Sequence, residues 1–203
     1  MRGFFSRRRS HSAAAPLARI AAMRNSFSLV LLVLCTSLAG CGKLSEKDVR
    51  HFVDQADDAA RKRFAPEICA LRGKDFKMHQ RFQTADERMA PAELDLGRQM
   101  FCVEAGKFSR LRQYQLERKS LEVDLAPDRK TARITAEYVE TLPYFEPDTM
   151  PVSPDDFREF QVLEVRDESV VGREGGDIVF LSMDADIHQK LVPRDSLDIP
   201  FTP

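Results

Sequence analysis

Residues 121–138 read Leu-Glu-Val-Asp-Leu-Ala-Pro-Asp-Arg-Lys-Thr-Ala-Arg-Ile-Thr-Ala-Glu-Tyr, and this stretch decides the class of fold. On each side of a turn at 126–129, apolar residues alternate with polar or charged ones. A period of two residues is typical of a β-strand with one buried and one exposed face. Ala-Pro-Asp is common in turns, so the stretch predicts two antiparallel strands joined by a short connection.

The chain on the C-terminal side continues this β pattern. A loop with four prolines follows the hairpin, and residues 157–174 then form a long strand pattern that is interrupted near Asp167 and Glu168. Gly175-Gly176 is a hairpin signal, and residues 177–183 form the last clear strand. From Tyr114 onward we therefore expect four antiparallel strands.

The chain on the N-terminal side has a helical pattern. Apolar residues recur at spacings of three, four and seven over 46–64, which predicts an amphipathic helix that begins after Ser45. Asp54, Asp57 and Asp58 fall opposite its apolar face and are expected to be surface charges. Three further elements are predicted: a short helix over 66–72, a strand over 75–83 and a helix over 92–111.

Helices followed by antiparallel strands are an α+β pattern. The order resembles the NTF2-like superfamily, which includes nuclear transport factor 2 and ketosteroid isomerase, over residues 45–183. The resemblance implies a cone in which N-terminal helices pack on a curved antiparallel sheet of four to five strands. It rests on element order and patterning rather than on a diagnostic motif. A cystatin-like or other helix-on-sheet arrangement is the alternative.

Enzymes with the cone fold place a tyrosine or a carboxylate in an apolar cavity, where burial shifts its pKa. By this resemblance Tyr138, which shares the apolar face of Ile134 and Ala136, is a candidate cavity residue. Tyr114, at the entry to the sheet, is a second candidate. An ordinary core tyrosine is the alternative for both. No Asp or Glu falls on the apolar phase of this strand before Glu140, near its end, so we assign no catalytic residue.

The first 40 residues have the pattern of an export signal. The apolar run from Phe27 to Ala39 has 13 residues, which would span about 20 Å as a helix and is too short for a bilayer core of roughly 30 Å. All six basic residues of this segment precede the run, and the segment contains no Asp or Glu. The run ends in Leu38-Ala39-Gly40-Cys41, which resembles the lipobox of bacterial lipoproteins.

The lipobox resemblance implies that residues 1–40 are removed and that the Cys41 sulfur receives diacylglycerol before the new amino group is acylated. The mature chain, 41–203, would be a single periplasmic α+β domain whose partner is the membrane, through the acyl anchor on Cys41. Gly42 after the cysteine fits sorting to the outer membrane. Ordinary cleavage after Ala39, or an uncleaved anchor, is the alternative.

Charge is distributed unevenly along the mature chain. Residues 42–119 carry 17 basic and 13 acidic side chains, whereas residues 120–203 carry 8 basic and 19 acidic ones. An acidic second half argues against nucleic acid as a partner, because a nucleic-acid surface needs clustered Lys and Arg. The simplest interpretation is that these acidic residues form the solvated outer faces of strands.

Two cysteines remain in the mature domain once Cys35 has left with the signal and Cys41 has been acylated: Cys69 and Cys102. In the oxidising periplasm such a pair is usually bonded where the geometry allows. We therefore expect a disulfide between them. Two separately buried cysteines, each acting as a small apolar side chain, are the alternative.

The sequence lacks the common catalytic motifs, including G-x-S-x-G, H-E-x-x-H, C-x-x-C and the P-loop. Asp184, Asp186 and His188 have a spacing that a metal could use, but a solvated strand end is the simpler interpretation. We predict neither a metal site nor a cofactor.

Taken together, these features favour a non-enzymatic, lipid-anchored binding or assembly module at the bacterial outer membrane, with its domain facing the periplasm. The alternative is a small-molecule carrier or enzyme that uses an NTF2-like cavity. A homodimer through the outward face of the sheet stays open, because the outward residues of 133–139 are neither plainly polar nor plainly apolar.

Overall fold

The computed structural model describes residues 42–111, 113–144 and 158–197. The chain divides into two units, Met1–Cys41 and Gly42–Pro203, and the description below concerns the second. The predictions for the signal peptide and for Cys41 lie outside the described residues. Within the described ranges, no helix combines the length and the apolar character that a membrane crossing requires.

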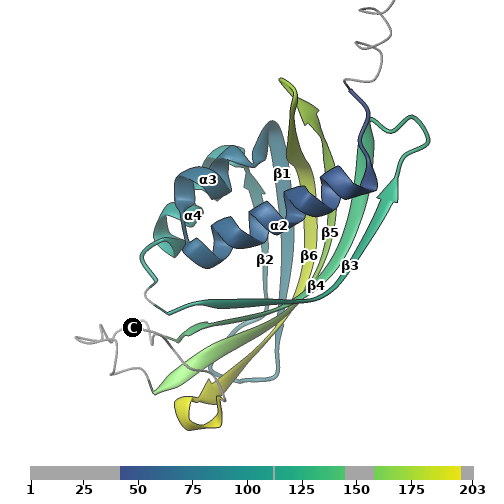
Figure 1. Ribbon diagram of the computed structural model, residues 1–203. Helices are drawn as coiled ribbons and strands as arrows, with labels where there is room; N and C mark the ends of the chain where they lie inside the picture. The colour runs from purple at the N-terminus through teal and green to yellow at the C-terminus, as the bar shows by residue number, and fades with distance from the viewer. Residues whose placement is uncertain (1–41, 112, 145–157, 198–203) are drawn as a thin grey trace, which may run out of the picture. The chain divides into compact units, whose positions relative to one another are not determined.

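Helix α2 (Glu46–Lys62) is the long helix that the amphipathic pattern predicts, and it lies along one face of the sheet (Figure 1). The Ser45 side chain caps its first turn by accepting a backbone N–H at 3.2 Å, and the helix ends where Arg63 adopts a left-handed conformation. Val49 and Phe52 are buried on the side that meets the sheet. Burial of this apolar stripe stabilises the helix more than intrinsic propensity does.

Six strands form one mixed sheet in the order β2-β1-β6-β5-β4-β3. The strands are β1 (Arg72–Thr84), β2 (Ala92–Gly97), β3 (Gln115–Leu125), β4 (Thr131–Pro143), β5 (Glu159–Glu174) and β6 (Asp177–Pro193). A short helical turn, η2 (Arg194–Ser196), follows β6. Neighbouring strands are antiparallel except β1 and β6, which are parallel. The sheet therefore has six strands instead of the expected four to five, and it is mixed instead of antiparallel.

The hairpin predicted from residues 121–138 is present as β3 and β4, in a register that pairs Leu125 with Ala132. The second hairpin also forms, with positive φ angles at Gly175 and Gly176 between β5 and β6. Strand β5 is continuous, so the interruption expected near residues 167–168 is wrong. Strand β6 continues past the expected end at 183, because it pairs with β5 on one side and with β1 on the other.

The helix predicted over 92–111 is wrong in its first part. Residues 92–97 form strand β2, and helix α4 (Arg98–Phe108) begins only after it. The backbone groups of β2 pair with the edge of β1, in a register that places Leu94 opposite Gln80. This long-range pairing satisfies the backbone of 92–97 and outweighs the local helix signal at Pro91.

Helices α3 (Ala65–Ala70) and α4 pack together beside the C-terminal end of α2 (Figure 1). The expected disulfide is present between them and joins Cys69 to Cys102, with the two Cα atoms 5.3 Å apart. A small apolar cluster of Ala59, Ile68 and Ala105 surrounds this junction. The bridge thus attaches α4, which follows the edge strand β2, to the helical layer.

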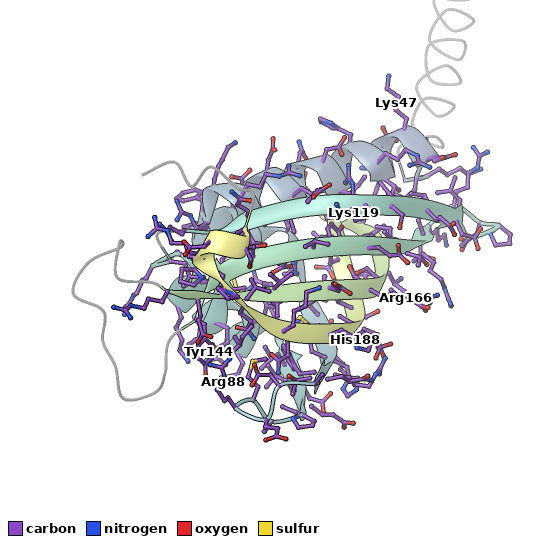
Figure 2. The ribbon with its side chains drawn as sticks, turned by 90° about the horizontal axis from the view of Figure 1, so that it is seen from below. Lys47, Arg88, Lys119, Tyr144, Arg166 and His188 are labelled. Atoms are coloured by element: carbon purple, nitrogen blue, oxygen red, sulfur yellow. A yellow bond between two sulfur atoms is a disulfide. The ribbon has the colours of Figure 1, made fainter. Side chains whose placement is uncertain are left out.

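The main core fills the space between α2 and the inner face of the sheet. Alternation along β4 places Ala132, Ile134 and Ala136 on this face, each at most 1% exposed. Val171 of β5 and Phe52 of α2 complete the same cluster. The opposite, outer face of the sheet is rich in charged side chains, and Lys119, Arg166 and His188 line one shallow depression there (Figure 2).

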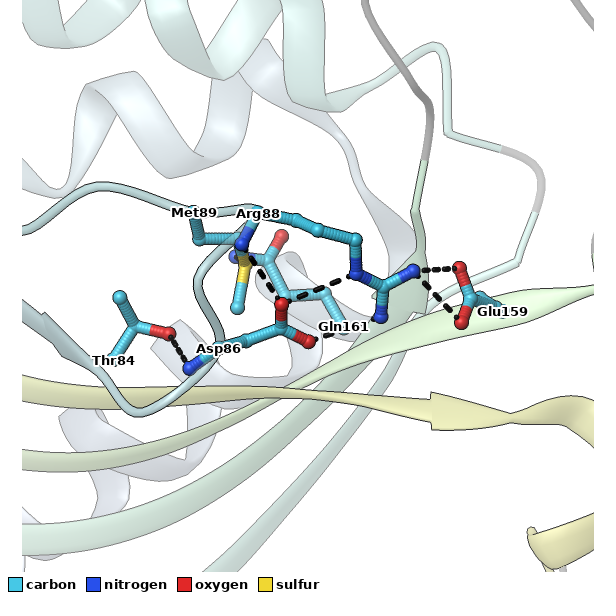
Figure 3. A network of polar contacts seen from close by, with 6 residues as sticks. All are labelled: Thr84, Asp86, Arg88, Met89, Glu159 and Gln161. Carbon is cyan, nitrogen blue, oxygen red and sulfur yellow. Dashed lines mark hydrogen bonds and ion pairs between the residues drawn. The ribbon is translucent and has the colours of Figure 1, made fainter.

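The connection between β1 and β2 is attached to β5 by an arginine. The Arg88 guanidinium donates to Asp86 through Nε (3.1 Å) and Nη2 (3.0 Å), and through Nη1 to Glu159 (2.9 Å) (Figure 3). Next to this network, the Gln161 side chain donates to Gln189 at 2.6 Å. These contacts hold the connection against the end of the sheet opposite the disulfide-linked helices.

Candidate functional site

A cavity of about 220 Å³ lies between α2 and the inner face of the sheet. Helix α2 and five strands or their flanking residues contribute to its wall. Most of the wall is apolar, and the apolar lining residues are Ala56, Ala60, Phe82, Leu116, Leu163, Val165, Phe180, Met183, Ala185 and Ile187. The polar lining residues are Asp57, Arg72, Gln80, Tyr114, Tyr138, Glu140 and Asp167. Four of these seven side chains titrate near neutral pH or carry a charge there.

Glu140 is brought into the cavity by the alternation of β4. It follows Ile134, Ala136 and Tyr138 on the inward phase, and the strand continues to Pro143, so Glu140 is not at its end. The pKa of Glu140 is raised to about 7, mainly by burial and also by the charge of Asp167. The hydrogen bond with Tyr114 opposes this rise. The carboxyl is therefore close to half-protonated at neutral pH.

Asp167 enters the cavity from β5 and is only 5% exposed. It pairs in register with Ala136 and Ala185, which both face inward. Ser169, also fully buried, donates its hydroxyl to the two carboxyl oxygens at 2.8 and 3.0 Å. Burial raises the pKa of Asp167 to about 7, and the Ser169 hydrogen bond and the Arg72 charge only partly oppose this rise.

The prediction that Asp57 is a surface charge is wrong, because Asp57 is 4% exposed and lines the cavity from α2. It lies four residues after the buried Val53, so it continues a line of inward positions on the helix. Its Oδ2 is 3.0 Å from Arg118 Nη1 and 3.7 Å from Arg61 Nη2. Burial raises the pKa of Asp57, and these two arginines lower it. Asp57 is thus a paired carboxylate.

Among the described residues, Arg72 is the only basic side chain that lines this cavity. Its guanidinium carbon is 4.4 Å from the ring centre of Phe180, 4.5 Å from that of Phe101 and 5.3 Å from that of Phe76. Desolvation lowers the pKa of Arg72 to about 10, and the Asp167 charge partly opposes this. The side chain therefore stays cationic at neutral pH, held among aromatic rings.

Both tyrosines that the sequence singles out line the cavity. Tyr114 packs edge-on against Phe108, with ring centres 4.5 Å apart, and hydrogen bonds to Glu140. Burial raises the pKa of Tyr114 and of Tyr138 well above the ordinary value, so both stay protonated at neutral pH. A neutral phenol can donate a hydrogen bond to an oxygen of a bound molecule.

Asp184, Asp186 and His188 face away from the cavity, on the outer side of β6. Arg81 of β1 pairs with the two aspartates, with distances of 2.6 Å from Nη2 to Asp184 and from Nε to Asp186. In the part of the chain that the structure describes, no three His, Cys, Asp or Glu side chains are grouped closely enough to hold a metal ion.

The sequence did not identify Asp57, Asp167 and Arg72 as cavity residues. It placed Glu140 on the apolar phase of its strand, but no role was assigned to it. The alternation along β5 could have identified Asp167 as an inward residue, because the apolar residues Leu163, Val165 and Val171 lie on the same phase of this strand. For Arg72 the sequence has no comparable signal, since its aromatic neighbours come from separate elements.

The arrangement combines two carboxyls that titrate near neutral pH with two protonated phenols and one cation in a mainly apolar enclosure. A carboxyl with pKa near the working pH can accept a proton in one step and return it in another. The low-polarity walls strengthen any such interaction with a bound molecule. The site is therefore equipped for binding a small molecule and for acid–base chemistry on it.

No family model matches this chain, and no curated protein matches it. Solved structures do match. A hexachlorocyclohexane dehydrochlorinase (LinA, type 2) has 9% identity and a TM-score of 0.51, over 77% of this chain and 92% of that one. A protein of the NTF2-like family from Streptomyces avermitilis, provisionally named a dehydratase, has 13% identity and a TM-score of 0.51, over 69% of this chain and 94% of that one.

A third similar structure, provisionally named an aromatic ring hydroxylase, comes from Novosphingobium aromaticivorans. It has 12% identity and a TM-score of 0.51, over 74% of this chain and 96% of that one. At such identities the likeness concerns the fold alone. The described domain has the NTF2-like fold, with helices packed on a curved sheet as the sequence resemblance implied.

Proposed function

We propose that the domain binds a small molecule in the cavity under α2 and that Glu140 and Asp167 exchange protons with it. The single observation that carries this proposal is that both carboxyls line one largely apolar cavity, where desolvation raises the pKa of each to about 7. Keeping an ionisable group in an apolar wall costs stability. Groups with such shifts are concentrated at functional sites.

The cavity volume limits the size of the bound molecule. Sites for drug-sized ligands usually enclose about 300–1,000 Å³, whereas this cavity encloses about 220 Å³. The proposed ligand is therefore a small metabolite with a largely apolar body, since apolar side chains form most of the wall.

Removal of a proton from carbon is the step that this equipment supports best. A carboxylate base in an apolar site, with the protonated Tyr138 to stabilise developing negative charge on oxygen, is suited to eliminations and isomerisations. The names of two structural neighbours, a dehydrochlorinase and a provisional dehydratase, describe eliminations. At 9% and 13% identity these names are not transferred, and the proposal depends on Glu140 and Asp167.

An incubation in D2O tests this function even while the substrate is unidentified. The full chain is mixed with a bacterial metabolite extract, returned to H2O, and the metabolites are searched by mass spectrometry for deuterium retained on carbon. We expect at least one metabolite to gain deuterium with the wild type, and little gain with Glu140→Gln or Asp167→Asn. The matched control is Glu137→Gln, which changes an exposed carboxylate on the outer face of β4.

Two results would change the conclusion. A metabolite that co-purifies with the protein but gains no deuterium would indicate a small-molecule carrier, which belongs to the alternative that the sequence leaves open. If no metabolite is retained and none gains deuterium, the cavity has no small-molecule role, and an assembly module becomes the better proposal.

The proposed location is the periplasmic side of the bacterial outer membrane, through acylation of Cys41. This part of the proposal is supported by the lipobox alone. The variant Cys41→Ser should move the protein from the membrane fraction to the soluble fraction, as measured by fractionation and immunoblotting. If the variant stays with the membrane as the wild type does, the lipid-anchor proposal is wrong.

A further inference from the structure

The starting observation is that the Arg72 guanidinium has aromatic neighbours but no acidic partner. Phe101 and Phe180 lie about equally close to its central carbon, at 4.5 and 4.4 Å. No carboxylate oxygen of residues 42–111, 113–144 and 158–197 lies within 4.0 Å of its nitrogens. Its Nε is buried and has no hydrogen-bond acceptor among these residues. A half-buried cation with a buried, unsatisfied N–H and no paired anion is costly and calls for a partner from outside.

The carboxyls of the same cavity already have partners. Ser169 donates to both oxygens of Asp167, Tyr114 hydrogen bonds to Glu140, and Arg118 pairs with Asp57. Asp57 Oδ2 also lacks a hydrogen bond, but it lies 3.0 Å from the Arg118 cation. Among the described residues, Arg72 Nε has neither a hydrogen bond nor an ion pair, so the complementary ligand group is an acceptor.

We propose that Arg72 binds the carboxylate of a small, mainly apolar monocarboxylic acid. This inference rests on the proposed function and extends it by naming the class of the ligand. A guanidinium presents its N–H groups in one plane as a fork that matches the two oxygens of a carboxylate. The three aromatic rings around the guanidinium carbon attract the cation but offer no oxygen acceptor to its N–H groups, so these groups can serve the ligand. The ligand body then lies along apolar walls such as Phe82, Val165 and Ile187.

The backbone holds this arginine at a defined position. Arg98 Nε, at the start of α4, donates to the Arg72 carbonyl at 3.0 Å, and the Phe180 N–H donates to the Leu71 carbonyl at 2.9 Å. The elements that carry Phe101 and Phe180 are thereby attached next to Arg72. An anchored donor loses little freedom on binding, which favours a tight complex.

Benzoate and benzamide are matched probes, because they share size and ring and differ in charge. Isothermal titration of the full chain in mild non-ionic detergent should give benzoate an affinity at least about tenfold higher than benzamide, as a charge-assisted contact warrants. In Arg72→Met this preference should disappear. Arg72→Lys, which keeps the charge but loses the planar fork, should retain only part of it.

Arg81→Met is the control, since Arg81 lies on the same strand but faces outward and pairs with Asp184 and Asp186. It should leave the benzoate preference unchanged. Equal binding of both probes, binding of neither at millimolar concentrations, or an unchanged preference in folded Arg72→Met would overturn the inference. If any of these results occurs while the D2O experiment still gives carbon-bound deuterium, the carboxylate inference fails and the proposed function stands.

Discussion

Two arginines of strand β1 occupy opposite environments. Arg81 lies on the outer face, where two aspartates of β6 each approach it to 2.6 Å. Arg72 lies at the start of the same strand, inside, among three phenylalanines and beyond 4.0 Å from any described carboxylate. The strand therefore presents a paired charge to solvent and an unpaired charge to the cavity.

The two environments make unequal contributions to the stability of the fold. An exposed pair contributes little, because water already solvates both charges. An unpaired charge or a neutral carboxyl in an apolar wall is unfavourable to folding unless something else compensates. The outer face thus follows the ordinary rules for stability, and the cavity departs from them at Arg72, Glu140 and Asp167. That departure is the physical basis for placing function in the cavity.

The largest expected effect is on chemistry inside the cavity. Glu140→Gln and Asp167→Asn remove groups that exchange protons near neutral pH, and each should slow deuterium incorporation about 10²–10⁴-fold, the usual contribution of a general acid or base. The measurement is the initial rate of deuterium gain by the metabolite that the D2O experiment identifies. Arg81→Met, on the outer face, should keep the wild-type rate. An equal loss in Arg81→Met would mean that the two faces are not functionally distinct.

The second effect is a stability that falls as pH rises. Burial raises the pKa of Asp167 from 3.8 to about 7 and that of Glu140 from 4.5 to about 7. Between about pH 4 and 7 the folded protein therefore holds protons that the unfolded chain has lost, and stability falls with increasing pH across this window. At about 1.4 kcal/mol per pKa unit, the loss is about 4 kcal/mol for Asp167 and about 3 kcal/mol for Glu140, each taken alone.

Urea denaturation of the full chain at pH 5 and pH 8 measures this effect. Stability at pH 5 should exceed that at pH 8, and the double variant Glu140→Gln/Asp167→Asn should show a much smaller difference. Asp57, whose pKa is also raised, contributes with the same sign and leaves a residual slope. The surface carboxylates Asp86 and Asp186 have lowered pKa values, so their contribution is lost only at more acidic pH. Higher stability at pH 8 in the wild type would contradict the buried-carboxyl interpretation.

The alternation of strands made much of this fold predictable, and it explains which site residues could be found. The inward phase of β4 identifies Tyr138 and also contains Glu140, which continues the same phase. The same argument applied to β5 would have found Asp167, had the charged pair 167–168 not been interpreted as a break. Asp57 was missed because one helical face can carry a buried carboxylate when arginines from α2 and β3 approach it.

The environment of Arg72 could not be predicted from local sequence. Its aromatic neighbours Phe76, Phe101 and Phe180 come from β1, α4 and β6. They meet only because β1 pairs in parallel with β6 and because α4 follows β2 back toward α3. Both features arise from long-range pairing that neither periodicity nor composition encodes. The same pairing accounts for the missed strand β2.

The third effect concerns the disulfide, which is next to the Arg72 end of β1. Cys102 follows Phe101, one of the rings near the Arg72 guanidinium. Closing a loop of 33 residues stabilises by about 3–4 kcal/mol in the chain-entropy model. Cys69→Ala/Cys102→Ala should therefore unfold at lower urea concentration and bind benzoate more weakly.

Hydrogen exchange of this double variant should increase around α3 and α4, whereas the Arg81 region should stay protected. Uniform loss of protection would mean that the bridge stabilises the whole domain without a special role near Arg72.

The smallest effect distinguishes the two arginines by the sign of their contribution to stability. Arg72→Met replaces an unpaired, half-buried cation by an apolar side chain of similar length, which should leave stability unchanged or raise it by about 1–4 kcal/mol. Arg81→Met leaves Asp184 and Asp186 facing each other without their cation, so stability should fall slightly. Because these charges reach solvent, salt should screen their repulsion, and the loss should shrink between about 0.05 and 0.5 M NaCl. The stability change in Arg72→Met should depend much less on salt, because Arg72 has no ion-pair partner among the described residues whose attraction salt would screen. Urea denaturation of both variants at the two salt concentrations makes the comparison.

A large, salt-independent loss of stability in Arg72→Met would show that the Arg72 charge is compensated inside the folded domain. Both arginines of β1 would then stabilise the fold through paired charges.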